Sequence, residues 1–232
     1  MSTQTRQRMH FVYYFGRVVI RFLAFIFASW KVKGKENLPK DKPVLIVCNH
    51  LHIADPPLIA ASIPLKCKFM AKNDLWDNAW TRYWVSNFGA FPVRRDAIDT
   101  EAIRSAERAL KEGFSIIIFP EGGRSRDAKM KEALPGAALI ASRMKVPLLP
   151  VSIAGSEHLR HLMSSFFRRP RITVTIGKPF NLPAHNGRLP REERKAMADF
   201  IMRKIAELLP PQYRGVYGIN RGVYGTENKT DN

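Results

Sequence analysis

The chain has 232 residues and a mass of 26.5 kDa, the size of one α/β domain with short additions. Its 38 Lys and Arg against 20 Asp and Glu give a formal net charge of +18, so its surface attracts polyanions such as nucleic acid, anionic lipid or phosphorylated substrates. The two cysteines, Cys48 and Cys67, both stand in apolar stretches. This placement argues against a disulfide framework or a zinc ribbon and fits a reducing compartment.

Residues 11–30 form an apolar and aromatic stretch that Arg17 and Arg21 interrupt. No small-residue cleavage site follows it, so it suits neither a signal peptide nor a membrane span. Basic residues flank it on both sides, and we therefore predict that residues 1–30 hold an amphipathic, membrane-associating helix whose arginines reach toward anionic headgroups. The protein would then be peripheral or monotopic on the cytoplasmic face of a membrane. The alternative is a buried core helix.

The part of the chain after this helix alternates short apolar runs with helical patterns. A short edge strand is expected at 30–35, and continuous apolar runs of strand length follow at 44–48, 67–70, 115–119, 148–153 and 172–176. Helical spacing occurs at 99–111, 133–144 and 191–209. This order predicts a single α/β domain over residues 31–210, with a mostly parallel central sheet flanked by helices.

Residues 211–232 contain a short duplication, with Arg-Gly-Val-Tyr-Gly at 214–218 and again at 221–225. Two copies are too few for a repeat architecture. We expect a flexible basic and aromatic tail, with a lipid or partner contact as the alternative.

The first candidate site follows the apolar run at 44–48, where parallel sheets usually bind ligands. His50 and Asp55 stand there, and an imidazole whose tautomer is held by a carboxylate can act as a general base toward a hydroxyl. Residues five apart on a regular helix point about 140° apart, so the pair requires an irregular turn. Alternatively, Asp55 before Pro56 is a helix cap with a purely structural role.

The second candidate site follows the apolar run at 115–119. Gly122 and Gly123 would let backbone N–H groups approach phosphate oxygens, Arg124 offers a planar fork, and Ser125 adds a neutral donor. The carboxylate of Glu121 would repel a phosphate unless it orients an arginine or accepts a substrate hydroxyl. A glycine-rich turn with solvated charges is the alternative.

Further basic residues follow other apolar runs. Lys72 ends the run that begins at Cys67, and Arg94 and Arg95 follow the apolar segment at 89–93. Their common placement suggests that they gather at one edge of the sheet.

In order and separation, these motifs resemble the glycerolipid acyltransferase family, which includes the 1-acylglycerol-3-phosphate (lysophosphatidate) acyltransferases. The family's histidine, four-residue gap and aspartate match His50 and Asp55, and its later blocks match residues 89–95, 119–125 and 146–151. Two positions depart from the family pattern: Gly123 stands where threonine is usual, and 51–54 lack the usual serine and aromatic residue. These departures leave the acceptor preference open.

The resemblance implies that His50 activates the acceptor hydroxyl and that Asp55 orients it. It also implies that five residues bind the phosphate end of the acceptor: Lys72, Arg95, Glu121, Gly122 and Arg124. Our interpretation of the loop as a phosphate site adds Gly123 and Ser125 to this set. The acyl donor would be a thioester, acyl-CoA or acyl-acyl carrier protein, used as a co-substrate without a cofactor or metal. The product would be phosphatidate for phospholipid biosynthesis, formed at an anionic phospholipid membrane.

Three alternatives stay open. The acceptor can be a different lysophospholipid or lipid alcohol. A metal-dependent hydrolase would use His50, His52 and Asp55, with His158 or His161 completing the ligands. A non-enzymatic membrane or nucleic-acid binding module would also explain the charge, but no motif for reading bases occurs, so no nucleic-acid partner is expected.

Overall fold

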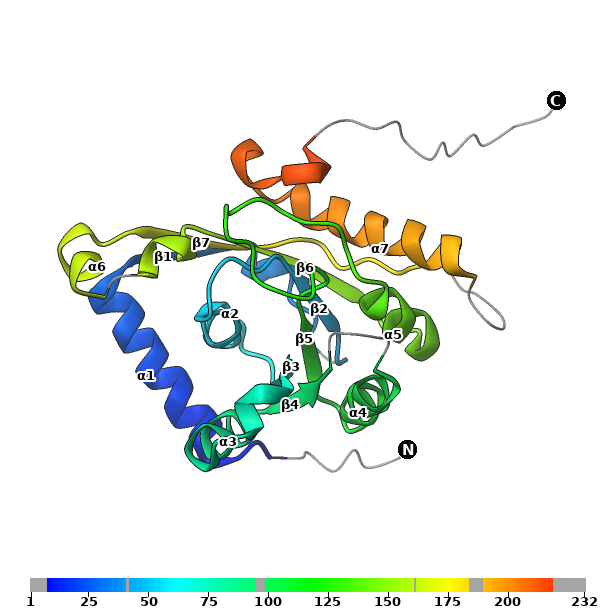
Figure 1. The fold of residues 1–232 in the computed structure, drawn as a ribbon, viewed down its shortest axis with the longest axis horizontal. Helices are drawn as coiled ribbons and strands as arrows, with labels where there is room; N and C mark the ends of the chain where they lie inside the picture. Colours follow the sequence, from blue (N-terminus) through cyan, green and yellow to red (C-terminus); the bar gives the residue numbers. More distant parts are fainter. Residues whose placement is uncertain (1–7, 41, 95–98, 161, 184–189, 219–232) are drawn as a thin grey trace.

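The computed structural model describes residues 8–40, 42–94, 99–160, 162–183 and 190–218 (Figure 1). They form a seven-stranded sheet in the order β1-β7-β6-β2-β5-β3-β4. Neighbouring strands are parallel except for β6 and β7. The strands are β1 (Ser29–Lys33), β2 (Leu45–Cys48), β3 (Cys67–Lys72), β4 (Ala90–Val93), β5 (Ser115–Ile118), β6 (Leu148–Ala154) and β7 (Arg171–Ile176). The predicted single α/β domain with a mostly parallel sheet is confirmed, and β1 lies at its edge as expected.

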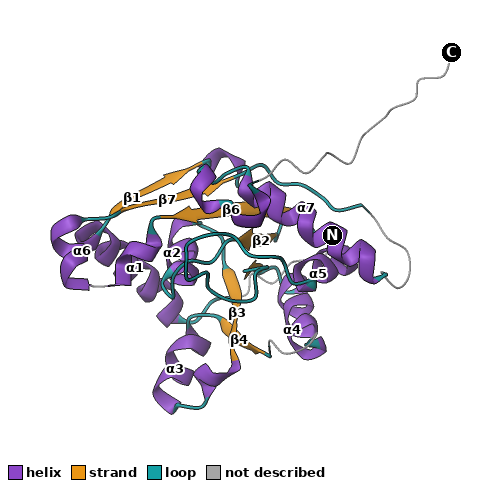
Figure 2. Cartoon of the chain, turned by 45° about the horizontal axis from the view of Figure 1, so that its top comes forward, coloured by secondary structure: helices purple, strands orange, loops and turns teal. Residues whose placement is uncertain are grey.

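Helices cover both faces of the sheet (Figures 1 and 2). The helices are α1 (Phe11–Phe27), α2 (Asp55–Ser62), α3 (Ala79–Asn87), α4 (Thr100–Lys111), α5 (Gly136–Met144), α6 (Leu162–Arg168) and α7 (Arg191–Ala206). Alternate residues of β2 point to opposite faces. Leu45 and Val47 pack with α4, α5 and α7, whereas Ile46 and Cys48 pack with α1 and α2. The central strands are therefore buried on both sides, which explains their continuous apolar runs.

Local signals in the sequence explain where α4 begins and ends. The side chain of Asp99 accepts hydrogen bonds from the backbone N–H groups of Glu101 and Ala102, which caps the first turn. After the helix, Gly113 adopts φ +85°, the left-handed conformation that ends helices and favours glycine. The helix therefore feeds directly into the buried strand β5.

The arginines of α1 donate hydrogen bonds to the end of α2, Arg17 from a half-buried and Arg21 from an exposed position. Arg17 Nη2 lies 2.8 Å from the Ile63 carbonyl oxygen, and Arg21 Nε lies 3.0 Å from that of Ala61. These carbonyls at the end of α2 lack partners within the helix and form the negative end of its dipole, so they attract cations. We predicted that these side chains reach toward lipid headgroups; in the structure they hold α1 against α2.

No helix in the described ranges is long and apolar enough to cross a membrane. Residues 211–218, which the sequence analysis placed in a flexible tail, form two short 3-10 helices, η4 (Pro211–Tyr213) and η5 (Gly215–Tyr217). The Tyr213 and Tyr217 rings pack against the hydrophobic core, and η5 contacts α7. The second copy of the duplicated motif, at 221–225, lies outside the described residues.

Candidate active site

The carboxyl ends of β2, β5, β3 and β4 meet at one edge of the sheet, because these four strands are parallel neighbours. His50 follows β2, Glu121 follows β5, Lys72 ends β3 and Arg94 follows β4. The topology therefore brings the predicted histidine, phosphate-loop and basic residues to the same edge.

His50 and Asp55 are in direct contact. Nδ1 of His50 lies 2.8 Å from Oδ2 of Asp55, whose side chain is fully buried at the first residue of α2. The same Oδ2 accepts the backbone N–H groups of Leu51 at 2.6 Å and His52 at 2.7 Å. Asp55 makes no capping bond to α2 and turns back toward the preceding loop. This tight loop is the irregular turn that a spacing of five residues requires.

The position of Asp55 selects the reactive nitrogen of His50. A carboxylate that accepts a hydrogen bond from Nδ1–H keeps the proton of the neutral imidazole on Nδ1. The free lone pair is then on Nε2. The ring stacks on Phe119, with centroids 4.2 Å apart, and 8% of the residue is exposed. The ring is thus fixed from both sides. Its Nε2 can accept a proton from a hydroxyl at the sheet edge.

The loops after β2 and β5 are joined by hydrogen bonds to the backbone of His50. Its N–H donates to Oε1 of Glu121 at 3.0 Å, and its carbonyl accepts the N–H of Ser125 at 2.8 Å. On the other side, the amide of Asn49 exchanges two bonds with the backbone of Ile153 in β6, at 2.8 and 2.9 Å. The histidine therefore stands on a loop that two neighbouring strands hold in place.

Glu121 is buried inside this junction. Its Oε2 accepts the N–H of Lys131 at 3.2 Å, so both carboxylate oxygens are bonded to backbone amides. Burial raises the pKa of Glu121 to about 7, while the bonds from His50 and Lys131 act in the opposite direction. The contacts of Glu121 are thus with the backbone that carries the histidine.

Two other predicted loop residues also make internal contacts. Ser125 is 1% exposed; its hydroxyl donates to Asp127 at 2.7 Å and accepts the N–H of Lys129 at 3.0 Å. Gly122 has φ +66°, and a Cβ there would lie 2.2 Å from the Leu134 side chain. Both residues shape the turn after β5.

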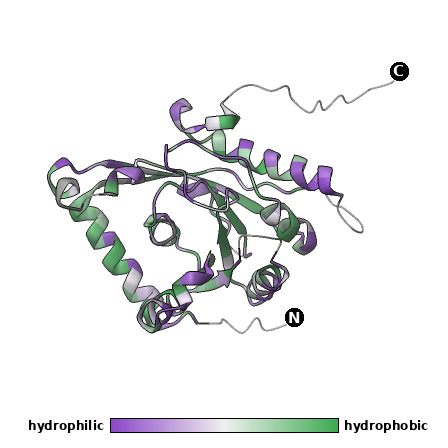
Figure 3. Cartoon of the chain, in the orientation of Figure 1, coloured by the Kyte–Doolittle hydropathy of each residue, from purple (hydrophilic) through white to green (hydrophobic). Residues whose placement is uncertain are grey.

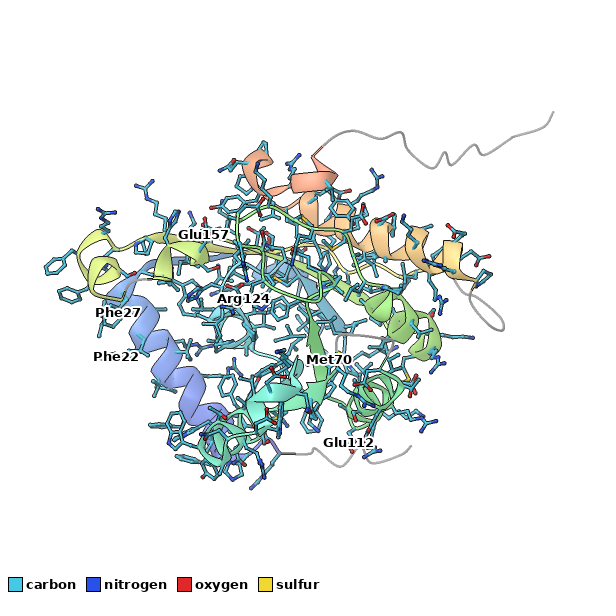
Figure 4. All side chains as sticks on the ribbon, in the orientation of Figure 1. Phe22, Phe27, Met70, Glu112, Arg124 and Glu157 are labelled. Atoms are coloured by element: carbon cyan, nitrogen blue, oxygen red, sulfur yellow. The ribbon has the colours of Figure 1, made fainter. Side chains whose placement is uncertain are left out.

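The remaining predicted phosphate-binding residues differ in their exposure to solvent. Arg124 is exposed and lies near the centre of the molecule in Figure 4. Gly123 precedes it and is half-buried. Lys72 is exposed at the end of β3 and pairs with Asp74. Arg95 lies outside the described residues.

Three supports of the site were not predicted: the Phe119 ring, the Asn49 amide and the backbone N–H of Lys131. Phe119 belongs to the motif at 119–125 and Asn49 directly precedes His50, so an aromatic ring and an amide were available signals. A backbone N–H has no sequence signal, because every residue except proline carries one.

The ligands proposed for a metal site do not gather in the described part of the chain. No group of three or more His, Cys, Asp or Glu side chains there could hold a metal ion. Nδ1 of His52 accepts the N–H of Ala54, and Nε2 of His158 lies 3.4 Å from Glu157. His161 lies outside the described residues.

Comparison with known proteins identifies the family. A family model described as Acyltransferase matches residues 29–154. The 1-acyl-sn-glycerol-3-phosphate acyltransferase of Bacillus subtilis is 32% identical over 200 residues, which cover 85% of this chain and 96% of that protein. The enzyme of the same name from Streptococcus pneumoniae is 32% identical over 185 residues, covering 75% and 64%.

A solved structure agrees with these matches. The 1-acyl-sn-glycerophosphate acyltransferase of Thermotoga maritima superposes with a TM-score of 0.63 at 30% identity, covering 85% of this chain and 78% of that one. The resemblance drawn from the motifs is confirmed, and the chain belongs to the acyltransferase family, whose members named here are O-acyltransferases.

Proposed function

We propose that this protein transfers a fatty acyl group from an acyl thioester to the free hydroxyl of 1-acylglycerol-3-phosphate, giving phosphatidate for phospholipid biosynthesis. The observation that carries the proposal is the buried contact between His50 and Asp55, 2.8 Å long, at the sheet edge of a chain in this family. The names of the relatives support the choice of acceptor.

The geometry of the pair supports a general-base mechanism. The acceptor oxygen attacks the thioester carbonyl carbon while its proton moves to Nε2 of His50, and Asp55 stabilises the imidazolium that forms. The tetrahedral intermediate then collapses, the C–S bond breaks, and the proton passes from the imidazolium to the departing thiolate. General-base catalysis of this kind contributes about 10²–10⁴-fold to the rate.

The acceptor's phosphate is assigned to the basic groups at the same edge. Arg124 has an exposed side chain there, and its planar fork matches phosphate oxygens. Lys72 adds positive charge, as does Arg95, which lies outside the described residues. The backbone of Gly123 offers an N–H group, whereas that of Gly122 donates to the Phe119 carbonyl at 3.0 Å. Glu121 and Ser125 contribute indirectly, because their polar atoms are used to hold the loop.

The acyl donor is acyl-CoA or acyl-acyl carrier protein, acting as a co-substrate without a cofactor. Both carriers are acidic, and a chain with a formal net charge of +18 attracts either.

An exposed apolar surface supports association with an anionic phospholipid membrane. On α1, large side chains recur every three or four residues along one side: Phe11, Phe15, Val18, Phe22 and Phe25, between 50% and 72% exposed. Figure 3 shows the hydrophobic colouring of this helix, and Figure 4 labels Phe22 and Phe27 at the rim of the molecule. The stripe consists of apolar side chains, and the guanidinium groups of Arg17 and Arg21 donate to carbonyls at the end of α2.

Aromatic residues of two neighbouring helices extend the stripe. Phe166 of α6 packs edge-on against Phe27, with centroids 6.0 Å apart, and Phe167 beside it is 78% exposed. On α3, Trp80 and Tyr83 are 71% and 53% exposed. Aromatic rings of this kind are favoured at the headgroup level of a bilayer. We assign the protein to the cytoplasmic face of a membrane, in a peripheral or monotopic position.

The catalytic proposal is tested by acyl transfer from a labelled thioester to lysophosphatidate in anionic vesicles, with and without a chelator. We expect chelator-resistant phosphatidate formation that His50→Ala abolishes. His158→Ala, which alters an exposed histidine, is the matched control and should retain activity.

Other results would redirect the proposal. Activity with a different lysolipid alone would overturn the acceptor assignment and keep the chemistry. Inactivity with every acceptor would support the binding module, and loss of activity to the chelator would support the metal-dependent alternative.

The membrane proposal is tested by flotation with vesicles of phosphatidylcholine and phosphatidylglycerol. The double variant Phe15→Ser, Phe22→Ser should lose binding. Phe200→Ser, at an exposed aromatic on α7, should keep it. Equal flotation of the two variants would show that the α1 stripe is not the lipid contact.

A further inference from the structure

Residues 211–218, which we call the C-terminal strap, lie against the loop that follows the candidate phosphate site. In Figure 1 the orange-red strap, after α7, meets the green loop between β5 and α5. The N–H of Met130 donates to the Tyr213 carbonyl at 2.8 Å, and the N–H of Val216 donates to the Met130 carbonyl at 3.4 Å. Met130 is 2% exposed beneath the strap. The loop is therefore held by its backbone at this point.

A second attachment lies three residues further along the loop. The hydroxyl of Tyr217 accepts the N–H of Ala133 at 3.2 Å and donates to Oδ1 of Asp199 in α7 at 2.9 Å. Burial, with a contribution from Asp199, raises the pKa of Tyr217 well above its ordinary value, so the hydroxyl stays protonated and able to donate. Tyr217 thus joins the loop to the helix layer.

The residue held between these two attachments connects to the catalytic histidine. Lys131 lies between Met130 and Ala133, and its N–H donates to Oε2 of Glu121 at 3.2 Å. Oε1 of the same carboxylate accepts the N–H of His50 at 3.0 Å. The strap is therefore connected to the backbone of His50 by hydrogen bonds at Met130 and Ala133, by the covalent backbone of the loop, and by the two bonds of Glu121.

The close approach of strap and loop depends on a glycine. Gly215 has φ +50°, and a Cβ there would lie 2.1 Å from the Met130 carbonyl oxygen, a backbone atom that cannot move aside cheaply. Gly218 in the same strap has φ −78°, and a Cβ there would meet its nearest atom at 3.3 Å. A Cβ at position 218 thus requires a shift of a few tenths of an ångström, whereas at position 215 it overlaps a backbone atom.

We propose that the C-terminal strap, through Gly215 and Tyr217, positions Glu121 and thereby His50 for acyl transfer. The two strap residues are positioning residues, since they act through the loop at 130–133. The expected change in the rate of acyl transfer rests on the proposed function. The expected change in amide hydrogen exchange does not.

The structural consequence is tested by amide hydrogen exchange on the full chain. Gly215→Ala and Tyr217→Phe should speed exchange at Lys131 and His50 by about tenfold or more, because local opening becomes easier when the attachments are lost. Gly218→Ala, whose Cβ would meet its nearest atom at 3.3 Å, is the matched control for the glycine and should change exchange much less. Tyr224→Phe, the same change in the second copy of the motif, is the control for the tyrosine.

In acyl transfer, we expect kcat of Gly215→Ala and of Tyr217→Phe to fall by about tenfold, with little change in KM for the thioester. The reason is that a small displacement of the base from its productive position lowers the rate of the chemical step. The Tyr217→Phe effect should largely disappear in a Glu121→Gln background, since both changes break the same series of contacts. A strap that supports only overall stability would give additive effects.

Several outcomes would overturn the inference. Unchanged exchange at Lys131 and His50 in Tyr217→Phe is one, and additive effects with Glu121→Gln are another. Should Gly215→Ala fail to fold, the milder Tyr217→Phe still decides the question. Inactivity of the native chain toward lysophosphatidate would overturn the proposed function alone, because the exchange result stands without a substrate.

Discussion

Replacing Asp55 with asparagine tests the catalytic pair with little change in shape. Oδ2 of Asp55 accepts bonds from His50, Leu51 and His52, whereas Oδ1 has no hydrogen-bond partner among the described residues. An asparagine oxygen can take the place of Oδ2 and its amide nitrogen that of Oδ1. The two backbone bonds, and with them the loop, should therefore persist in Asp55→Asn.

What asparagine removes is the negative charge facing the imidazolium. A hydrogen bond to a charged group contributes about 1.5–3 kcal/mol, and each ~1.36 kcal/mol corresponds to a tenfold change in rate. Asp55→Asn should therefore lower kcat by roughly 10- to 150-fold, with KM for lysophosphatidate nearly unchanged. Asp55→Ala should cost more, because it also leaves the buried N–H groups of Leu51 and His52 unpaired.

The assay is the initial rate of thiol release from the acyl thioester with lysophosphatidate in mixed micelles, beside a thermal melt of each variant. Asp77→Asn, at an exposed aspartate, is the matched control. Near-native kcat in a folded Asp55→Asn variant would refute the assignment of Asp55 as the group that stabilises the imidazolium.

Three further predictions concern charge. The carboxyl of Glu121 has its pKa raised by burial from 4.5 to about 7, so its contribution to stability is complete below pH 4.5 and is lost as the pH rises through 7. Thermal melts between about pH 5 and 8 should show a decline in native stability that Glu121→Gln reduces; parallel curves would contradict this. Arg124→Gln should raise KM for lysophosphatidate by about tenfold while leaving that for monoacylglycerol unchanged, in steady-state assays. Equal effects on both acceptors would show that Arg124 does not contact the phosphate. Arg17→Met, which removes a donor to the Ile63 carbonyl, should lower the free energy of unfolding by about 1–2 kcal/mol in urea denaturation; an unchanged value would show that water replaces the arginine.

Much of the architecture could be predicted from local pattern. The strands β2, β5 and β6 are continuous apolar runs because both faces of a parallel sheet are covered, and such runs are visible without any knowledge of neighbours. Asp99, the first residue of the helix predicted over 99–111, is the residue that caps α4, because helix ends are set by nearby residues. The spacing of the site motifs was sufficient to indicate the family.

Element bounds were less accurate where distant contacts intervene. The pattern predicted a helix over 133–144, but α5 begins at Gly136. The N–H groups of Ala133 and Leu134 are bonded to Tyr217 and to the Pro120 carbonyl, so these residues remain in the loop. These contacts agree with a local signal, since Pro135 immediately precedes α5 and proline is tolerated only in the first turn of a helix.

The sequence by itself determined the α/β class, the order of strands and helices along the chain, and the motif residues from His50 to Ser125. Only the tertiary structure decided that Arg17 caps α2, that Glu121 binds backbone amides, and that residues 211–218 bond to the backbone of Met130. The physical reason is that these contacts are made by backbone N–H and carbonyl groups, which nearly every residue carries alike. Side-chain patterns report which residues are apolar or charged, whereas the fold alone brings a particular carbonyl or amide within reach of a distant partner.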